Sequence, residues 1–323
     1  MRAGEQTSES SLPDPPLAAP YADVAVIVPC YNEELTVAKV VTDFMHALPG
    51  AQIIVYDNNS SDETALRASQ AGAIVRLAPR QGKGNVVRQM FDEVDARIYV
   101  MVDGDDTYPA EAAPELIAEL RKTDADMLVG VRMLSFAAGS FRRFHRLGNR
   151  LVAWLISRLF SSKVTDVLSG YRVFSRSFVK TVPLISEGFE IETEMTLQAL
   201  AKRFIIRELP IAYGRRPEGS RSKLDTWSDG FLVLKSIAMI CKDYKPLLFF
   251  SSLGGFLLVV TLIAGLAPIV DYVRERYVYH LPLAILATGT GILSALSLTI
   301  GLILHTISRY HNENFELLRR LRR

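Results

Sequence analysis

Residues 99–109 read YVMVDGDDTYP, a run of β-forming residues that ends in a cluster of acids. Residues 99–102 are apolar or aromatic and predict a buried strand. Three carboxylates follow, those of Asp103, Asp105 and Asp106. Carboxylates crowded at a strand end repel one another, so a positive group is expected beside them. A divalent cation holding a phosphorylated ligand would meet this need; a solvated turn with Asp in its favoured positions is the other interpretation.

The chain around this stretch alternates between strands and helices. Apolar runs predict strands at 24–30, 52–58, 73–78, 97–103 and 125–133. Start signals and apolar periodicity predict helices from Asn32 as N-cap to residue 48, and within 60–72, 82–94 and 110–122. This alternation predicts an α/β fold with a mostly parallel sheet and helices on both faces.

Polar clusters stand at the carboxyl ends of four predicted strands. They are PCYNE (29–33), DNNSSDE (57–63), DGDDTYP (103–109) and GVRM (130–133). Because ligands of such sheets bind outside the carboxyl ends of the strands, this convergence favours a ligand-binding role for Asp103 and Asp105. Neither a GxGxxG after the first strand nor a GxxxxGK[ST] occurs, so a dinucleotide fold and a P-loop are unsupported. QGKGN (81–85) is Gly-rich and basic, and a simple turn before a helix explains it equally well.

Two charge-free segments, 247–270 and 281–304, are long enough to cross a bilayer, which takes about 20 residues. A buried helical hairpin of a soluble protein is the alternative. Lys242 and Lys245 precede the first segment, and several arginines follow the second. By the positive-inside rule both termini are expected in the cytoplasm, as in a multi-pass protein of the cytoplasmic membrane.

These patterns divide the chain into five parts. We expect a disordered tail, an α/β domain, a juxtamembrane amphipathic helix, two transmembrane helices and a basic cytoplasmic tail, at 1–22, 23–230, 231–246, 247–308 and 309–323. The tail lacks the apolar core of a signal peptide, and two cysteines are too few for a disulfide framework. The net charge is +2 with the basic residues localised, and no nucleic-acid partner is expected.

Seven motifs in order resemble those of a known family: VPCYNEE, DNNSSDET, GKGN, DGDDTYP, DVLSGYRVF, FEIETEM and PEGSRSKL. Over residues 24–230 the chain resembles the family 2 glycosyltransferases of GT-A fold. Within them it is most similar to the polyprenyl-phosphate group, with dolichyl-phosphate mannose synthases and their bacterial glucosyl and N-acetylglucosaminyl relatives. The resemblance implies a membrane enzyme that moves a sugar from a nucleotide sugar to a polyprenyl phosphate. UDP-glucose or UDP-N-acetylglucosamine is favoured as donor, and GDP-mannose is the alternative.

Site residues carry over by position. The resemblance implies that nucleotide-sugar contacts come from Pro29, Tyr31, Glu33, Asp57, Asp103, Gly104, Asp105, Arg132, Arg216 and Lys223. Asp103 and Asp105 resemble the D-x-D pair that binds Mg²⁺ or Mn²⁺, ions that prefer such hard oxygen ligands. Thr107 stands where mannose synthases often have Gln, which leaves the third protein ligand open.

A lipid phosphate needs cations to position it rather than a base to activate it, because it is largely a dianion at pH 7. The resemblance implies lipid-phosphate contacts from Arg132, Arg143, Arg146 and Ser169. It assigns catalytic roles to Asp166, Arg132 and Arg146, with Asp166 beside the transferred sugar. Because the lipid phosphate needs no base and can attack the anomeric carbon directly, we expect the anomeric configuration to be inverted. Glu190 and Glu192 orient sugar hydroxyls or simply occupy the first turn of a helix.

Two other functions stay open. A processive polysaccharide synthase shares the fold and spans, but its QxxRW motif does not occur here. A non-catalytic membrane partner of a lipid-sugar flippase is the second. Homo-oligomerisation is left open as well.

Overall fold

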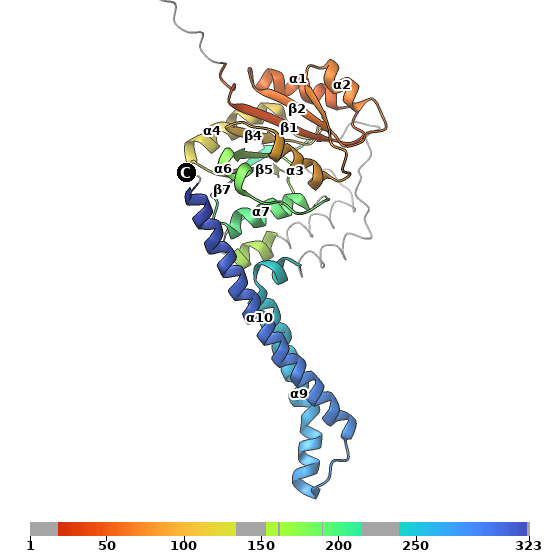
Figure 1. Cartoon of the computed structure of the whole chain (residues 1–323). Helices are drawn as coiled ribbons and strands as arrows, with labels where there is room; N and C mark the ends of the chain where they lie inside the picture. Colours follow the sequence, from red (N-terminus) through yellow and green to blue (C-terminus); the bar gives the residue numbers. More distant parts are fainter. Residues whose placement is uncertain (1–18, 134–152, 161, 189, 215–238, 322–323) are drawn as a thin grey trace, which may run out of the picture.

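The computed structural model describes residues 19–133, 153–160, 162–188, 190–214 and 239–321. An α/β domain lies at one end, and two long helices project from it as a pair (Figure 1). All structural statements below concern these residues.

One seven-stranded sheet forms the centre of the domain, in the order β3-β2-β1-β4-β6-β5-β7. Its strands are β1 (Val24–Cys30), β2 (Gln52–Asp57), β3 (Ile74–Leu77), β4 (Ile98–Met101), β5 (Met127–Met133), β6 (Arg172–Ser175) and β7 (Ile206–Ala212). β1 pairs in parallel with β2 and β4, and β7 pairs in parallel with β5. β6 alone runs antiparallel, between β4 and β5. The mostly parallel sheet confirms the predicted class, whereas β6 and β7 were not among the predicted strands.

Helices cover both faces of the sheet, as predicted. They are α1 (Val37–Ala47), α2 (Thr64–Gln70), α3 (Lys83–Glu93), η1 (Ala110–Ala112), α4 (Ala113–Thr123), α6 (Arg176–Thr181) and α7 (Ile191–Ala201). Apolar side chains of α1, α2 and α4 pack with Val24, Val26 and Val28 of β1. Those of α3, α6 and α7 pack on the other face, with Ala25 and Ile27. The alternation along β1 arises because successive strand side chains point to opposite faces.

The predicted start of the first helix at Asn32 is wrong, because α1 begins at Val37. Asn32 has a φ of 52°, and its side chain accepts a hydrogen bond from the Ser61 backbone N–H at 2.8 Å. Its own backbone N–H donates to the Ser60 hydroxyl. Asn32 therefore ties the loop after β1 to the loop after β2 instead of capping a helix.

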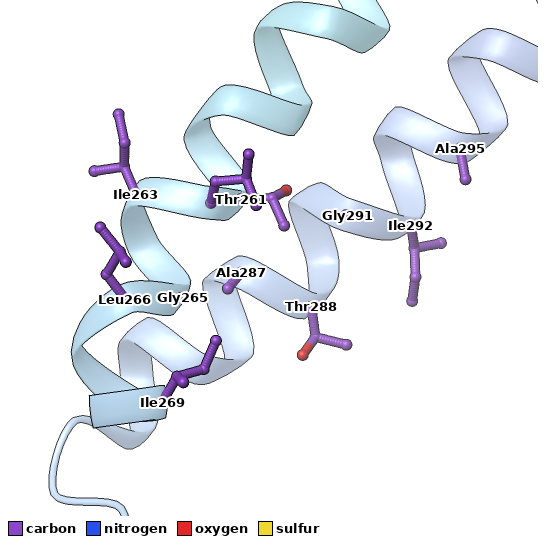
Figure 2. A pocket seen from close by; sticks show the side chains of 11 residues that line it. Thr261, Ile263, Gly265, Leu266, Ile269, Ala287, Thr288, Gly291, Ile292 and Ala295 are labelled. Atoms are coloured by element: carbon purple, nitrogen blue, oxygen red, sulfur yellow. The ribbon is translucent and has the colours of Figure 1, made fainter. Parts of the chain in front are cut away.

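The apolar segments form α9 (Pro246–Glu275) and α10 (Leu281–Leu321), both candidate membrane spans by length and composition. Ser294 of α10 donates to the Gly254 carbonyl oxygen at 2.8 Å, and the Thr261 and Thr290 hydroxyls are 2.8 Å apart. Such small and hydroxyl residues allow close helix approach in lipid. An apolar groove of about 650 Å³ is lined by residues of both helices, among them Thr261, Ile269 and Ala295 (Figure 2).

Candidate active site

The acidic cluster follows β4 at the carboxyl edge of the sheet. Asp105 is buried, and its Oδ1 accepts hydrogen bonds from the Thr107 hydroxyl at 2.6 Å and the Thr107 backbone N–H at 3.2 Å. Thr107 therefore orients Asp105. Asp106 has a φ of 56° and pairs with Lys39 of α1 at 2.8 Å. Asp106 therefore contacts α1, and Asp103 and Asp105 are the candidate metal ligands of the three carboxylates.

Lys83 supplies the positive charge that the acidic cluster requires. Its Nζ lies 2.5 Å from Asp103 Oδ1 and 2.5 Å from Glu192 Oε1. The side chains of Lys83 and Glu192 are only 11% and 5% exposed. Burial alone would lower the pKa of Lys83, but the charges of Asp103 and Glu192 outweigh it and raise this pKa. Sequence reasoning missed Lys83, although the Gly-rich basic motif GKGN was its signal.

Two glycines hold Lys83 in this place. Gly82 has a φ of 118°, a region that glycine adopts without strain. A Cβ on Gly84 would overlap the Ser186 carbonyl oxygen, and the Gly84 N–H donates to the Glu187 carbonyl oxygen at 3.0 Å. The start of α3 is therefore pressed against the loop that leads to α7, which carries Glu192.

Arg132 at the end of β5 is joined to Asp166. Its Nε and Nη2 donate to the two carboxylate oxygens at 2.8 Å each, and its backbone N–H donates to Oδ2 at 3.2 Å. The side chains are 22% and 6% exposed. The Arg132 guanidinium also lies 5.5 Å from the centre of the Tyr213 ring. The sequence predicted both residues at the site, but not that one holds the other.

The loop before β6 brings Asp166 to the acidic cluster. Because β6 is antiparallel, its first residue lies at the edge where the parallel strands end. A Cβ on Gly170 would overlap the Asp103 carboxylate, so this loop touches Asp103.

The same loop is fixed by hydrogen bonds from Ser169 and Arg172. The Ser169 hydroxyl donates to the Gly130 carbonyl oxygen at 2.6 Å. Arg172 is fully buried and donates to the carbonyl oxygens of Val167 and Ser169 and to the Thr196 hydroxyl, which fixes the shape of the loop.

The ends of β1 and β2 lie at the same carboxyl edge of the sheet as the acidic cluster. Pro29 lies in β1, Tyr31 is 37% exposed, and the backbone N–H of buried Glu33 donates to the Thr64 hydroxyl at 2.8 Å. Asp57 ends β2 and is 6% exposed. Its Oδ1 is buried and accepts no hydrogen bond within the described part of the chain. A buried acceptor of this kind is expected to meet a donor from a ligand or water.

Gly104 is a packing residue between strand ends. A Cβ on it would lie 2.5 Å from Cys30 Sγ, and the Thr36 hydroxyl donates to its carbonyl oxygen at 2.6 Å. Four of the predicted site residues, Arg143, Arg146, Arg216 and Lys223, lie outside the described residues. Glu190 lies at the N-cap of α7.

Comparison with known proteins gives the family. The glycosyl transferase family 2 model matches residues 25–182. Glycosyltransferase AglJ of Haloferax volcanii is 31% identical over 300 residues, which cover 92% of this chain and 98% of AglJ. The chain belongs to glycosyl transferase family 2. The dolichyl-phosphate hexose transferase of the same organism is 30% identical over 225 residues, covering 70% of this chain and 96% of that protein.

The fold of this family 2 glycosyltransferase is that of solved GT-A enzymes. The structure of glucosyl-3-phosphoglycerate synthase from Mycobacterium tuberculosis matches with a TM-score of 0.55 and 21% identity, over 68% of this chain and 78% of that one. This likeness confirms the predicted fold class.

Asp103 and Asp105 suit a divalent metal in this glycosyltransferase. Mg²⁺ is commonly held by one or two carboxylates together with substrate phosphates and water. The described residues contain no cluster of three or more His, Cys, Asp or Glu side chains that would hold a metal alone. The Lys83 ammonium beside Asp103 shows that this position accommodates positive charge. The donor set therefore fits an ion that a diphosphate helps to bind.

Proposed function

We propose that this enzyme transfers a hexose from a nucleotide sugar to a polyprenyl phosphate with inversion at the anomeric carbon. The products are a nucleoside diphosphate and a polyprenyl-phosphate sugar. The donor that we favour is UDP-glucose or UDP-N-acetylglucosamine, with GDP-mannose as the alternative.

The distribution of charge across the crevice carries this proposal. Asp103 and Asp105 offer carboxylate oxygens at the end of β4, while Arg132 offers a guanidinium at the end of β5. The loop that carries Asp166 and Gly170 touches both groups. A nucleoside diphosphate bound through a cation suits the acidic side, and a phosphate monoester suits the guanidinium.

On the donor side, Asp57 would accept a hydrogen bond from a ring N–H of the base, which both uracil and guanine possess. Pro29, Tyr31 and Glu33 would border the base and ribose. Bound at Asp103 and Asp105, Mg²⁺ or Mn²⁺ would neutralise charge on the departing diphosphate. The Mycobacterium tuberculosis synthase with the same fold was solved with Mn²⁺ and UDP-glucose, which supports this assignment.

On the acceptor side, a phosphate oxygen would attack the anomeric carbon from the face opposite the diphosphate. The new C–O bond forms as the bond to the diphosphate breaks, and no proton needs to move because the attacking phosphate is already ionised. Arg132 would hold this phosphate, and Asp166 would hold Arg132 in place through its two carboxylate oxygens. An α-linked donor then gives a β-linked product.

A lipid acceptor is supported by the relative named dolichyl-phosphate hexose transferase and by the two candidate spans. We place the catalytic domain, residues 23–230, and both termini on the cytoplasmic side, since basic residues flank the spans. Undecaprenyl and dolichyl phosphate share the phosphate chemistry that Arg132 recognises.

The test is a screen of radiolabelled UDP-glucose, UDP-N-acetylglucosamine and GDP-mannose against both lipid phosphates, with Mg²⁺, Mn²⁺ or EDTA. We expect one donor to be used, no transfer in EDTA, and at least a hundredfold loss in Asp105→Ala, since removing charge stabilisation of about 3 kcal/mol costs that much. NMR coupling constants of the product should show inversion. An α product from an α donor, or full activity in EDTA, would contradict the mechanism.

A further inference from the structure

Helix α10 is longer than a membrane span requires. Its 41 residues correspond to about 60 Å, whereas about 20 residues cross a bilayer. The helix continues past its charge-free part and returns to the α/β domain (Figure 1). There the Phe315 ring packs edge-on against Phe204, with ring centres 6.2 Å apart.

Phe315 also covers a buried lysine. Lys202, directly after α7, is 6% exposed, and its Nζ lies 4.8 Å from the centre of the Phe315 ring. The Nζ donates to Gln198 Oε1 at 2.5 Å, and among the described residues no carboxylate pairs with it. Burial lowers the pKa of Lys202. Because no carboxylate among the described residues forms an ion pair with Lys202, the electron-rich face of the Phe315 ring stabilises the charge of this buried ammonium.

The segment that enters α9 makes a second attachment. Ile240 is buried in a cluster with Ala153, Ile156 and Leu197 of α7. The Tyr244 ring packs edge-on against Phe160 at 6.0 Å. The helical pair is therefore fixed to the domain at the start of α9 and at the end of α10.

Both attachments converge on α7, which also reaches the crevice. Leu197 and the adjoining Lys202 serve the attachments, and Glu192 in the first turn holds Lys83 beside Asp103. A helix is stiff over this length, so a tilt imposed at one end moves the other. Phe315 also packs against the core cluster that contains Ile191 of α7 and Val87 of α3, so packed side chains link the end of α10 to the helix that carries Lys83.

We propose that α7 and the end of α10 form a mount that sets the height and tilt of the crevice above the bilayer, with Phe315 and Lys202 as positioning residues. The mount rests on the proposed function only in that the acceptor phosphate lies in a membrane. If the domain is held at a fixed height and tilt, its site binds acceptor phosphates at headgroup depth in one orientation. If the domain is loosely tethered, the site samples many orientations relative to the bilayer.

The kinetic test compares two acceptors with the full chain. Phe315→Ala and Lys202→Met are assayed with undecaprenyl phosphate in liposomes and with a ten-carbon prenyl phosphate in detergent. Misplacement should lower kcat/KM for the bilayer acceptor about tenfold, with the short acceptor and the donor KM changed less than twofold. Leu317→Ala, an exposed residue of the same helix, should match the wild type in both assays. Equal losses with both acceptors, or no loss in liposomes, would overturn the mount.

A physical readout separates failure of the mount from failure of the proposed function. Spin labels at Lys122→Cys on α4 and Tyr310→Cys on α10, both exposed, report the distance between domain and helix in a Cys241→Ser background. The distance distribution should be narrow in the parent and broad with Phe315→Ala or Lys202→Met. This result does not depend on any substrate. A distribution that stays narrow in both variants would refute the mount even if lipid phosphate is the acceptor.

Discussion

Replacing Asp166 by Asn tests whether this carboxylate acts on the sugar or through Arg132. The amide keeps the shape of the side chain and one acceptor oxygen. Its NH₂ group would face a guanidinium N–H where a carboxylate oxygen now accepts at 2.8 Å. The change therefore removes one charge-assisted hydrogen bond and the ion pairing of a largely buried pair, while the loop keeps its backbone contacts with Glu208.

The magnitude follows from this geometry. A hydrogen bond to a charged group contributes roughly 1.5–3 kcal/mol, and breaking a buried ion pair costs roughly 3–5 kcal/mol. Taking about 3 kcal/mol for the conservative amide, and about 1.4 kcal/mol per tenfold in rate, we expect kcat/KM for the lipid phosphate to fall by roughly 150-fold. Asp166→Glu should recover part of this loss, since it restores the charge.

The assay is a double-mutant cycle on kcat/KM with Asp166→Asn, Arg132→Gln and the pair. If Asp166 acts only by holding Arg132, the double variant should be no slower than Arg132→Gln alone, within about threefold, because residues in contact are non-additive. If the double variant instead loses the product of the two single-variant losses in kcat/KM, Asp166 acts on the sugar independently of Arg132. Circular dichroism of each variant controls for folding.

Two further substitutions address the acidic side of the crevice. Lys83→Met should lower the stability of the metal-free protein by roughly 2–3 kcal/mol, since the buried Glu192 and the 26% exposed Asp103 lose their counter-charge. Mg²⁺ should restore more stability than in the wild type, and an unchanged metal-free Tm would argue against this role. Gly84→Ala should impair both stability and transfer because its Cβ overlaps the Ser186 carbonyl oxygen. Gly255→Ala, with nothing within 4 Å, is the matched control and should leave the protein active; equal behaviour of the two would rule out the overlap.

Local sequence patterns were enough to predict the first half of the sheet. The apolar run at 24–30 coincides with β1, because hydrophobic β-formers between polar clusters leave few other conformations. β6 was missed because it directly adjoins α6, so no turn signal marks the end of the strand. The helix start predicted at Asn32 was wrong because asparagine is favoured both as an N-cap and as a turn residue, and the sequence does not show which hydrogen-bond partners it has.

At the site, the sequence predicted which residues gather but not how they pair. Asp103 and Asp105 could be placed from the strand that precedes them. That Lys83 would bridge Asp103 and Glu192 depends on the packing of α3 against α7, which arises from tertiary contacts far apart in the chain. The same holds for the ion pair of Arg132 with Asp166, which requires β6 to run antiparallel beside β5.

The place of β6 in the sheet governs how a nascent chain can assemble. β5 pairs with β6 and β7 but with no earlier strand, so it leaves the ribosome before any of its sheet neighbours exist. Strands β1 to β4 are contiguous both in the chain and in the sheet, so they can pair with one another before β6 has been made. β6 pairs with both β4 and β5, so its addition joins the two parts of the sheet, and it requires closure of the loop that follows β5. A partly synthesised chain can therefore build the Asp57 side of the crevice, while the Arg132 side forms only after β6 has been made.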